Sequence, residues 1–104
     1  MIRWGLTFRF LRVLALGLWS FSPLLLSLLL VIMFLGYLVG RQEGWRRSDS
    51  FYWAFVTATT VGYGDFRPTR RHSRIIAILI AVLGLLTSGI IIALGVRAAT
   101  KALG

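Results

Sequence analysis

The sequence has no cysteine, only three acidic residues and a single histidine. Without cysteine, the chain has no disulfide and no thiolate metal site, and its redox compartment cannot be inferred. Three acids and one histidine do not supply the nucleophile, base and oxyanion donors that a catalytic site combines. We therefore expect neither an enzyme nor a bound cofactor.

The scarcity of acids leaves twelve basic residues and a net charge of +9. In a soluble protein, so high a charge would favour nucleic-acid binding. Here the arginines lie mostly at the ends of apolar runs, where their long side chains reach lipid headgroups and water. We expect the lipid bilayer as the partner, and no nucleic acid.

Two long runs carry no charge at all. The first extends from Val13 to Gly40 over 28 positions, and the second from Ile75 to Val96 over 22 positions. A membrane crossing needs about 20 mostly apolar residues. With 58% hydrophobic residues in 104 positions, two buried helices of a soluble protein are the weaker alternative, because so short a chain cannot hide that much apolar surface. The sequence predicts an all-α, multi-pass membrane protein with a single domain over residues 1–104.

The amino-terminal segment is both aromatic and basic. Four of its apolar side chains share one helical face: Trp4, Phe8, Leu11 and Ala15. The three arginines of this segment do not gather on the opposite face, so the amphipathic signal is weak. An interfacial helix over residues 1–21 and a frayed basic terminus remain alternatives. A cleaved signal peptide is not expected, because the uncharged run is too long.

Candidate caps divide the rest into helices. Ser22 followed by Pro23 predicts an outer helix over residues 22–40. Ser73 predicts the start of an inner helix over residues 74–99. Gly36 and Gly40 within the outer helix permit close helix contact, or occur there by chance.

A short apolar segment lies between the two spans. The polar stretch 40–49 reads as an exposed turret, and Ser48, Asp49 and Ser50 offer caps for a helix over residues 49–59. This helix is too short to cross the bilayer. A strand at that depth would leave its backbone groups unpaired, so we expect a re-entrant helix.

The loop after this helix reads Thr60-Val61-Gly62-Tyr63-Gly64, followed by Asp65. Thr-Val-Gly-Tyr-Gly is the known signature of potassium selectivity filters, in which backbone carbonyls replace the water around the ion. The two glycines accept positive φ, which turns successive carbonyls to one side. One chain supplies one wall, so four copies are needed to surround an ion.

Residues 50–65 and the second span resemble the pore module of two-transmembrane tetrameric potassium channels. The likeness extends from about Pro23 to Ala99. It implies a homotetramer that conducts K⁺ passively, with an unidentified gating stimulus. The loop would face the extracellular side of the cell membrane and the termini the cytoplasm. K⁺ would bind the carbonyls of residues 60–63, with the Thr60 hydroxyl innermost, and Gly64 would complete the filter.

The resemblance also implies roles along the second span. Gly84 falls at the family's gating hinge, although simple helix packing is the alternative. Thr87 and Ser88 would line a water-filled cavity below the filter. The inner gate would lie around Ile92, Ala93 and Val96.

Two positions depart from some relatives. Val56 stands where those relatives have a glutamate that pairs with the acid after the filter. Asp65 therefore needs another partner, for which we expect Tyr52 or Trp53 on the pore helix. Arg67 stands at the outer mouth where an aromatic residue elsewhere binds external tetraethylammonium, so we expect weak block by that cation.

Other interpretations remain in view. Five basic residues lie on the terminal side and seven on the loop side, so the positive-inside rule weakly opposes the orientation that the motif implies. A less selective cation channel is a rival that Tyr63 argues against. A small lytic or regulatory two-span protein would have no use for the filter glycines. The chain is either a minimal channel or a pore from a longer protein.

Overall fold

The computed structural model describes residues 2–104, which form four helices and no strand. The helices are α1 (Ile2–Ser20), α2 (Ser22–Glu43), α3 (Arg47–Ala58) and α4 (Arg71–Leu103). Met1, which belongs to the segment expected as an interfacial helix, lies outside the described residues, as does the side chain of Arg3. The prediction of an all-α fold is confirmed.

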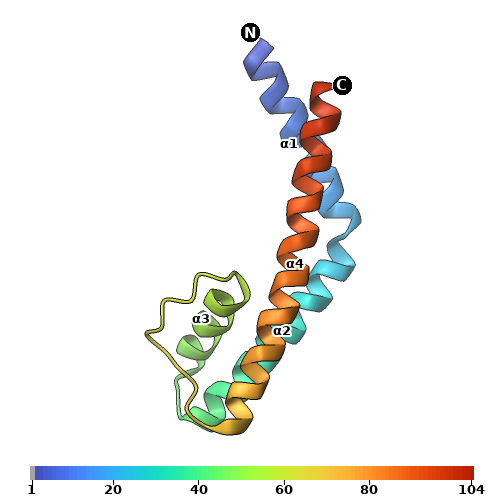
Figure 1. The fold of residues 1–104 in the computed structure, drawn as a ribbon. Helices are drawn as coiled ribbons and strands as arrows, with labels where there is room; N and C mark the ends of the chain where they lie inside the picture. The colour runs from blue at the N-terminus through green and yellow to red at the C-terminus, as the bar shows by residue number, and fades with distance from the viewer. Residues whose placement is uncertain (1) are drawn as a thin grey trace.

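Two of the helices are long and apolar enough to cross a membrane, namely α2 with 22 residues and α4 with 33 residues. At 1.5 Å per residue, α4 is about 50 Å long, well beyond the ~30 Å hydrocarbon core of a bilayer. Figure 1 shows α2 running toward the end of the molecule that carries α3 and α4 returning beside it, so both termini lie at the opposite end.

The first two helices are separated by a break at Phe21. Pro23 has no N–H to donate to the carbonyl of Trp19, so a proline here interrupts the helical ladder. The Ser22 hydroxyl donates to that carbonyl instead, at 2.7 Å. The prediction that Ser22 caps the outer helix is wrong: Phe21 occupies the cap position without a side-chain cap bond.

Helix α1 packs along the carboxyl-terminal part of α4 (Figure 1). Its contact face includes Gly17, where an added Cβ would lie 3.2 Å from Leu94 Cδ2. Three large apolar side chains share the helical face that was expected to meet the membrane surface, and all three are exposed: Trp4, Phe8 and Leu11. The segment is therefore a helix, docked on α4 by one face.

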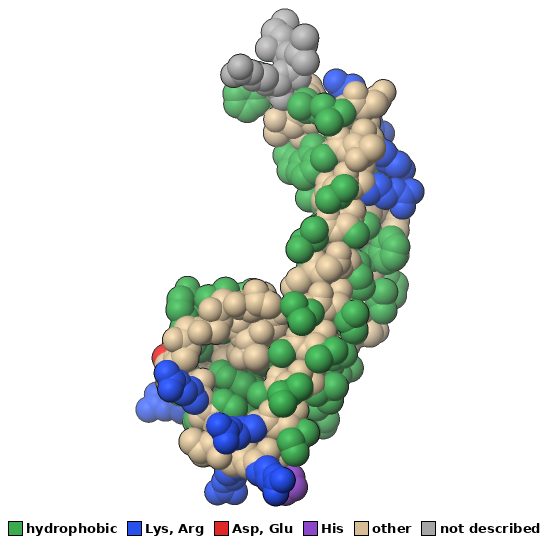
Figure 2. All heavy atoms as spheres, in the orientation of Figure 1, with side chains coloured by type: hydrophobic (Ala, Val, Ile, Leu, Met, Phe, Trp, Pro, Cys, Tyr) green, Lys and Arg blue, Asp and Glu red, His purple; other side chains and the backbone are tan. Residues whose placement is uncertain are grey.

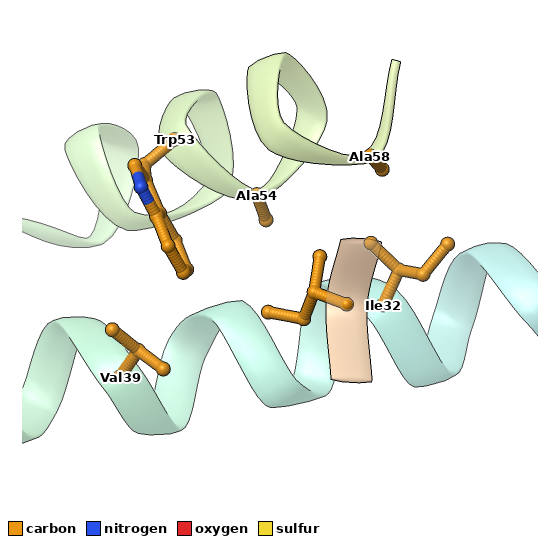
Figure 3. Close-up of a cluster of buried hydrophobic side chains, with 6 residues drawn as sticks. Ile32, Val39, Trp53, Ala54 and Ala58 are labelled. Carbon is orange, nitrogen blue, oxygen red and sulfur yellow. The ribbon is translucent and has the colours of Figure 1, made fainter. Parts of the chain in front are cut away.

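Helix α3 packs on α2 through small residues. An added Cβ at Gly36 would overlap Ala54, and one at Gly40 would overlap Ser50. Figure 3 shows Trp53, Ala54 and Ala58 of α3 facing Ile32 and Val39 of α2. The glycine spacing thus serves close helix contact rather than occurring by chance.

The predicted caps of α3 are wrong. The helix begins at Arg47, and Arg46 with an extended backbone precedes it without a side-chain cap bond. Ser50 lies inside the helix, where its hydroxyl donates to the Arg46 carbonyl at 2.9 Å. Neither Ser48 nor Asp49 takes the cap position.

The amino terminus of α4 is capped from another helix. It begins at Arg71 rather than after Ser73, and Ser73 is fully buried with its hydroxyl on Gln42 and Glu43. The Glu43 carboxylate also accepts the Thr69 N–H, the Thr69 hydroxyl and the Arg70 N–H. An acceptor with negative charge satisfies the free N–H groups of a helix start, so the end of α2 clamps the beginning of α4.

Candidate functional site

Helix α3 and the filter loop connect the end of α2 to the start of α4, at one end of these two long helices. Helix α3 has 12 residues, which is about 18 Å and too short to span. The chain turns at the end of α3 and runs back beside it to the start of α4 (Figure 1). This path is that of a re-entrant segment.

The backbone of the loop alternates in handedness. Positive φ occurs at Thr60 (67°), Gly62 (56°) and Gly64 (82°). The two glycines adopt it at little cost, as expected. Thr60 was missed, because a β-branched residue rarely takes positive φ. Alternate residues in opposite conformations allow successive carbonyls to point toward one side of the loop.

Backbone N–H groups of the loop are hydrogen-bonded, whereas several of its backbone carbonyls are not. The N–H groups of Val61 and Gly62 both donate to the Val56 carbonyl, at 3.1 and 3.3 Å. Within the described residues, the carbonyl oxygens of residues 60–63 accept no hydrogen bond. Residues 60–63 are exposed in the single chain, so their four free carbonyls are available to coordinate a ligand through oxygen atoms.

That row of carbonyls follows the carboxyl end of α3 directly. The last helical residue is Ala58, and the Thr59 N–H still bonds to the Phe55 carbonyl at 3.0 Å. The helix end carries partial negative charge, as do the carbonyls themselves. The electrostatic character of the site therefore favours a cation.

Val56 supports the loop with its backbone and not with its side chain. The side chain is buried and carries no polar atom, while the carbonyl holds the two N–H groups of the loop. Residue type at position 56 indicates only that a carboxylate is missing, because the backbone carbonyl is the same for every residue.

Asp65 has Tyr52 as its partner. Loss of water around the phenol, followed by the hydrogen bond to Asp65 and its negative charge, raises the pKa of Tyr52. A tyrosine phenol is protonated at neutral pH, so Tyr52 is a donor to the carboxylate. Asp65 also accepts the Phe66 N–H at 3.2 Å. Trp53, the other expected partner, is buried instead.

An aromatic cluster supports the outer part of the loop. Trp45 packs edge-on against Trp53 and Phe66, with ring centroids 5.4 and 5.3 Å apart. Tyr52 meets Phe66 at 6.2 Å. Trp45 and Phe66 were not among the predicted support residues, although aromatic residues flanking both ends of a short helix and its loop are a usable signal.

Arg67 folds back over the outer end of the filter. Its Nε donates to the Gly64 carbonyl at 3.1 Å. A guanidinium keeps its charge at any physiological pH, so a fixed cation stands at the mouth of the carbonyl row.

Gly84 lies where α4 meets the end of α3. It is buried, and an added Cβ would overlap the backbone of Ala58. The helix is continuous here. The structure thus gives Gly84 a packing role, and its role as a hinge stays a prediction.

A pocket of about 200 Å³ opens beside this contact, between α2, the end of α3 and the middle of α4. Thr59, Thr87 and Ser88 contribute hydroxyl-bearing side chains to its lining. The Thr87 hydroxyl donates to the Leu83 carbonyl at 2.8 Å. The rest of the lining is mostly apolar, so the role of Thr87 and Ser88 in a water-filled cavity stays a prediction.

The predicted inner-gate residues lie on the opposite face of α4 from α1. Ile92 and Val96 are 65% and 62% exposed, and Ala93 is exposed as well, whereas Leu94 and Ala98 are buried. Nothing in the described part of this chain covers the exposed face, so a gate there would require further copies and stays a prediction.

Comparison with known proteins identifies the family of this chain. The family model described as "Ion channel" matches residues 24–101, three quarters of the chain. The chain is 44% identical over 63 residues to TWiK family of potassium channels protein 7 of Caenorhabditis elegans, covering 60% of the chain and 11% of the worm protein. It is 54% identical over 39 residues, 38% of the chain, to the human potassium voltage-gated channel subfamily A members 5 and 10.

These curated relatives are much longer proteins. The matched region covers 6% of the human subfamily A member 5 and 8% of member 10. No solved structure matches the chain.

Proposed function

Because this chain belongs to the ion channel family, we propose that it conducts potassium passively across the membrane through the carbonyls of residues 60–63. The observation that carries the proposal is the row of four unpaired carbonyls in a loop of alternating φ. Carbonyl rings can replace the hydration shell of K⁺. This transport needs no cofactor, and K⁺ is the permeant ion.

The proposed conducting species is a homotetramer. One chain offers one wall of carbonyls, and four walls enclose an ion. Val61 and Tyr63 support this assembly, because their side chains are 52% and 72% exposed in the single chain. Residues of alternating conformation that turn their carbonyls to one side leave such side chains on the other, where neighbouring copies would cover them.

The four α3 helices would add to the selectivity for cations. Each helix ends at Ala58 and is followed by its cap residue Thr59, directly before the filter. The partial negative charge of a helix end stabilises a cation by roughly 0.3–2 kcal/mol, depending on exposure. The Thr60 hydroxyl would be the innermost ligand.

We propose that the filter faces the extracellular side and both termini the cytoplasm. Both termini lie at the end of the molecule opposite the loop (Figure 1). This arrangement supports placing both termini on the same side of the membrane. The assignment of that side to the cytoplasm rests on the family resemblance. The small excess of basic residues at the loop end would favour the opposite orientation.

The carboxyl-terminal half of α4 is the proposed gate. Opening would bend or tilt α4 near Gly84 and separate the copies around Ile92, Ala93 and Val96. Thr87 and Ser88 would line the space between filter and gate. The stimulus for opening is not defined by these residues.

The experiment is potassium and sodium flux through the purified protein in liposomes, beside Gly64→Ala. Gly64 has φ of 82°, which alanine adopts only with strain, so we expect K⁺ flux to fall, by about tenfold for each 1.4 kcal/mol added to the barrier to ion passage. Gly5→Ala is the matched control, since Gly5 has no atom within 4 Å of an added Cβ. Equal K⁺ flux in wild type and Gly64→Ala, or equal K⁺ and Na⁺ flux in wild type, would overturn the proposal.

A further inference from the structure

The face of α1 that points away from α4 is apolar and uncovered. Trp4, Phe8 and Leu11 follow one another at spacings of four and three residues, which places them on one side of the helix. All three are more than half exposed, whereas Leu6 and Phe10 on the other side are half-buried. Figure 2 shows hydrophobic side chains on the surface of this end of the molecule, next to Lys and Arg side chains.

This row lies outside the hydrocarbon of the bilayer. The uncharged run of α1 begins at Val13 and that of α4 ends at Val96, and charged residues mark the membrane surface beyond them. At 1.5 Å per residue, Phe8 and Trp4 lie about 8 and 13 Å beyond Val13 along the helix, whereas the headgroup layer of one leaflet is about 5–8 Å thick. Helix α1 continues beside α4 to the end that carries the carboxyl terminus (Figure 1). Lipid tails therefore do not cover Trp4 and Phe8 at this distance.

An open pocket of about 290 Å³ lies at the same end, where α1 meets α4. Within the described residues, its lining comes from these two helices and carries no charge: Leu6, Thr7, Phe10, Ala99, Ala102 and Leu103. Leu103 is exposed, so the pocket can be reached from outside the chain. Such a lining fits an apolar side chain, whereas a charged group would lose its hydration there without a partner.

Phe8 lies level with this pocket. It is two residues from both Leu6 and Phe10, about 3 Å along the helix. Rotation about an axis parallel to the helices leaves every residue at its own height, so in a ring of copies Phe8 of one copy is level with the pocket of the next. Because Phe8 and the pocket occupy different faces of α1, the contact is head-to-tail, and a head-to-tail contact forms a closed ring when the rotation closes.

We propose that the Phe8 side chain of one copy fills the pocket between α1 and α4 of the neighbouring copy. The proposal rests on the homotetramer of the proposed function, in which four Phe8 side chains fill four pockets. An aromatic side chain seated in a well-packed pocket is the typical anchor of a protein interface. Residues 99–103 of α4 are then held between two copies of α1, one from the same chain and one from its neighbour.

The test is disulfide cross-linking, which the cysteine-free chain allows without background. Phe8→Cys/Leu103→Cys places one thiol on the apolar row of α1 and one at the pocket. Oxidation of the purified protein in detergent should give a ladder of linked species that ends at the tetramer, on gels without reductant. Each single variant should stay monomeric, because equivalent residues of neighbouring copies do not meet in a head-to-tail contact.

The matched control is Trp19→Cys/Leu103→Cys. Trp19 is exposed and lies on the same side of α1 as Phe8, but it is about three turns, or about 16 Å, away along the helix. A disulfide needs Cβ atoms within about 3.5–4.5 Å. The control should therefore stay monomeric under the same oxidation.

A second set of variants tests whether the Phe8 ring stabilises the assembly. Phe8→Ala should raise the protein concentration at which the tetramer half-dissociates in detergent at least about tenfold, measured by light scattering. Phe8→Leu, which keeps an apolar side chain for the pocket, should restore most of the loss. Phe34→Ala removes a phenylalanine that is also more than half exposed, but within the uncharged run of α2, and should stay within about twofold of wild type.

Two results would overturn the proposal. One is a yield of linked species from Phe8→Cys/Leu103→Cys no higher than that of its control, and the other is equal dissociation of wild type and Phe8→Ala. Either would leave the apolar row to the membrane surface or to a different protein. Val96→Cys, on the face of α4 proposed to meet its copies, separates this failure from failure of the tetramer. Linkage through Val96→Cys alone would reject the Phe8 contact and keep the tetramer, whereas linkage in neither would reject both.

Discussion

At the scale of single residues, Thr60 shows how the loop departs from ordinary backbone. A non-glycine residue with positive φ costs about 1–3 kcal/mol, and such strain persists only where surrounding contacts impose it. Here the Thr60 N–H bonds to the Thr57 carbonyl, and the next two N–H groups are held by Val56. The end of α3 therefore forces the turn that exposes the carbonyl row.

Residue type predicted part of this loop and not the rest. Gly62 and Gly64 predict positive φ, because glycine adopts positive φ at little cost. Thr60 and the Val56 carbonyl carry no such signal, since any residue has a carbonyl and threonine disfavours the conformation. The Asp65 partner was narrowed to two aromatic residues, and only packing distinguishes Tyr52 from the buried Trp53.

Arg67 gives a prediction at the same scale. Its guanidinium at the Gly64 carbonyl repels a second cation, so external tetraethylammonium should block K⁺ current weakly. Arg67→Tyr removes the charge and adds a ring that attracts cations by about 0.5–2 kcal/mol, so block should tighten several-fold or more. The measurement is a dose–response curve in planar bilayers.

The control for this prediction is Arg71→Tyr, which makes the same change at the exposed first residue of α4. Its block constant should match that of wild type. Sub-millimolar block of the wild type would contradict the role assigned to Arg67.

At the scale of helices, the contact between α2 and α4 depends on a carboxylate. Glu43 serves three groups at the start of α4 besides the Ser73 hydroxyl. A carboxylate that caps a helix from a distant segment both satisfies its N–H groups and opposes its dipole. The clamp fixes where the loop returns to the inner helix.

Removal of this clamp should be measurable as a loss of stability. Glu43→Ala removes the carboxylate that caps the exposed N–H groups of Thr69 and Arg70, so we expect a loss of about 0.5–2 kcal/mol in the free energy of unfolding. Thermal denaturation followed by circular dichroism checks it.

Asp49→Ala is the matched variant, because Asp49 lies in the first turn of α3 without a hydrogen bond to its side chain. It should cost no more than the ~0.3–1 kcal/mol of a charge near a helix start. A loss as large for Asp49→Ala as for Glu43→Ala would show that the clamp adds nothing.

Helix existence was predictable from the sequence, whereas helix ends were not. Uncharged runs of adequate length identified α2 and α4, and a short segment between them identified α3. Each predicted serine cap was wrong. At the start of α4, the acceptor is Glu43, 26 residues before Thr69. Local sequence cannot show a cap that arrives from another helix. For the same reason, the docking of α1 on α4 could not be foreseen.

At the scale of the whole molecule, a single chain leaves its functional surfaces uncovered. Val61 and Tyr63 in the filter and Ile92 and Val96 in the inner helix are all more than half exposed. Lipid could cover apolar side chains, but it cannot satisfy the free carbonyls beside them. The proposed tetramer resolves both deficits, because the same four-fold axis would bring carbonyls around the ion and the inner helices together below it.

The absence of cysteine makes this assembly directly testable. Val96→Cys introduces the only thiol in the chain on the face of α4 proposed to meet its copies. Oxidation should then link copies into disulfide-bonded dimers, because a disulfide forms where Cβ atoms approach within about 3.5–4.5 Å. Val31→Cys, at an exposed valine of α2, should give monomers under the same treatment. Gel electrophoresis without reductant separates the two products. Equal dimer yields from both variants would mean that the thiols meet by random collision, and that Val96 does not lie near a shared axis.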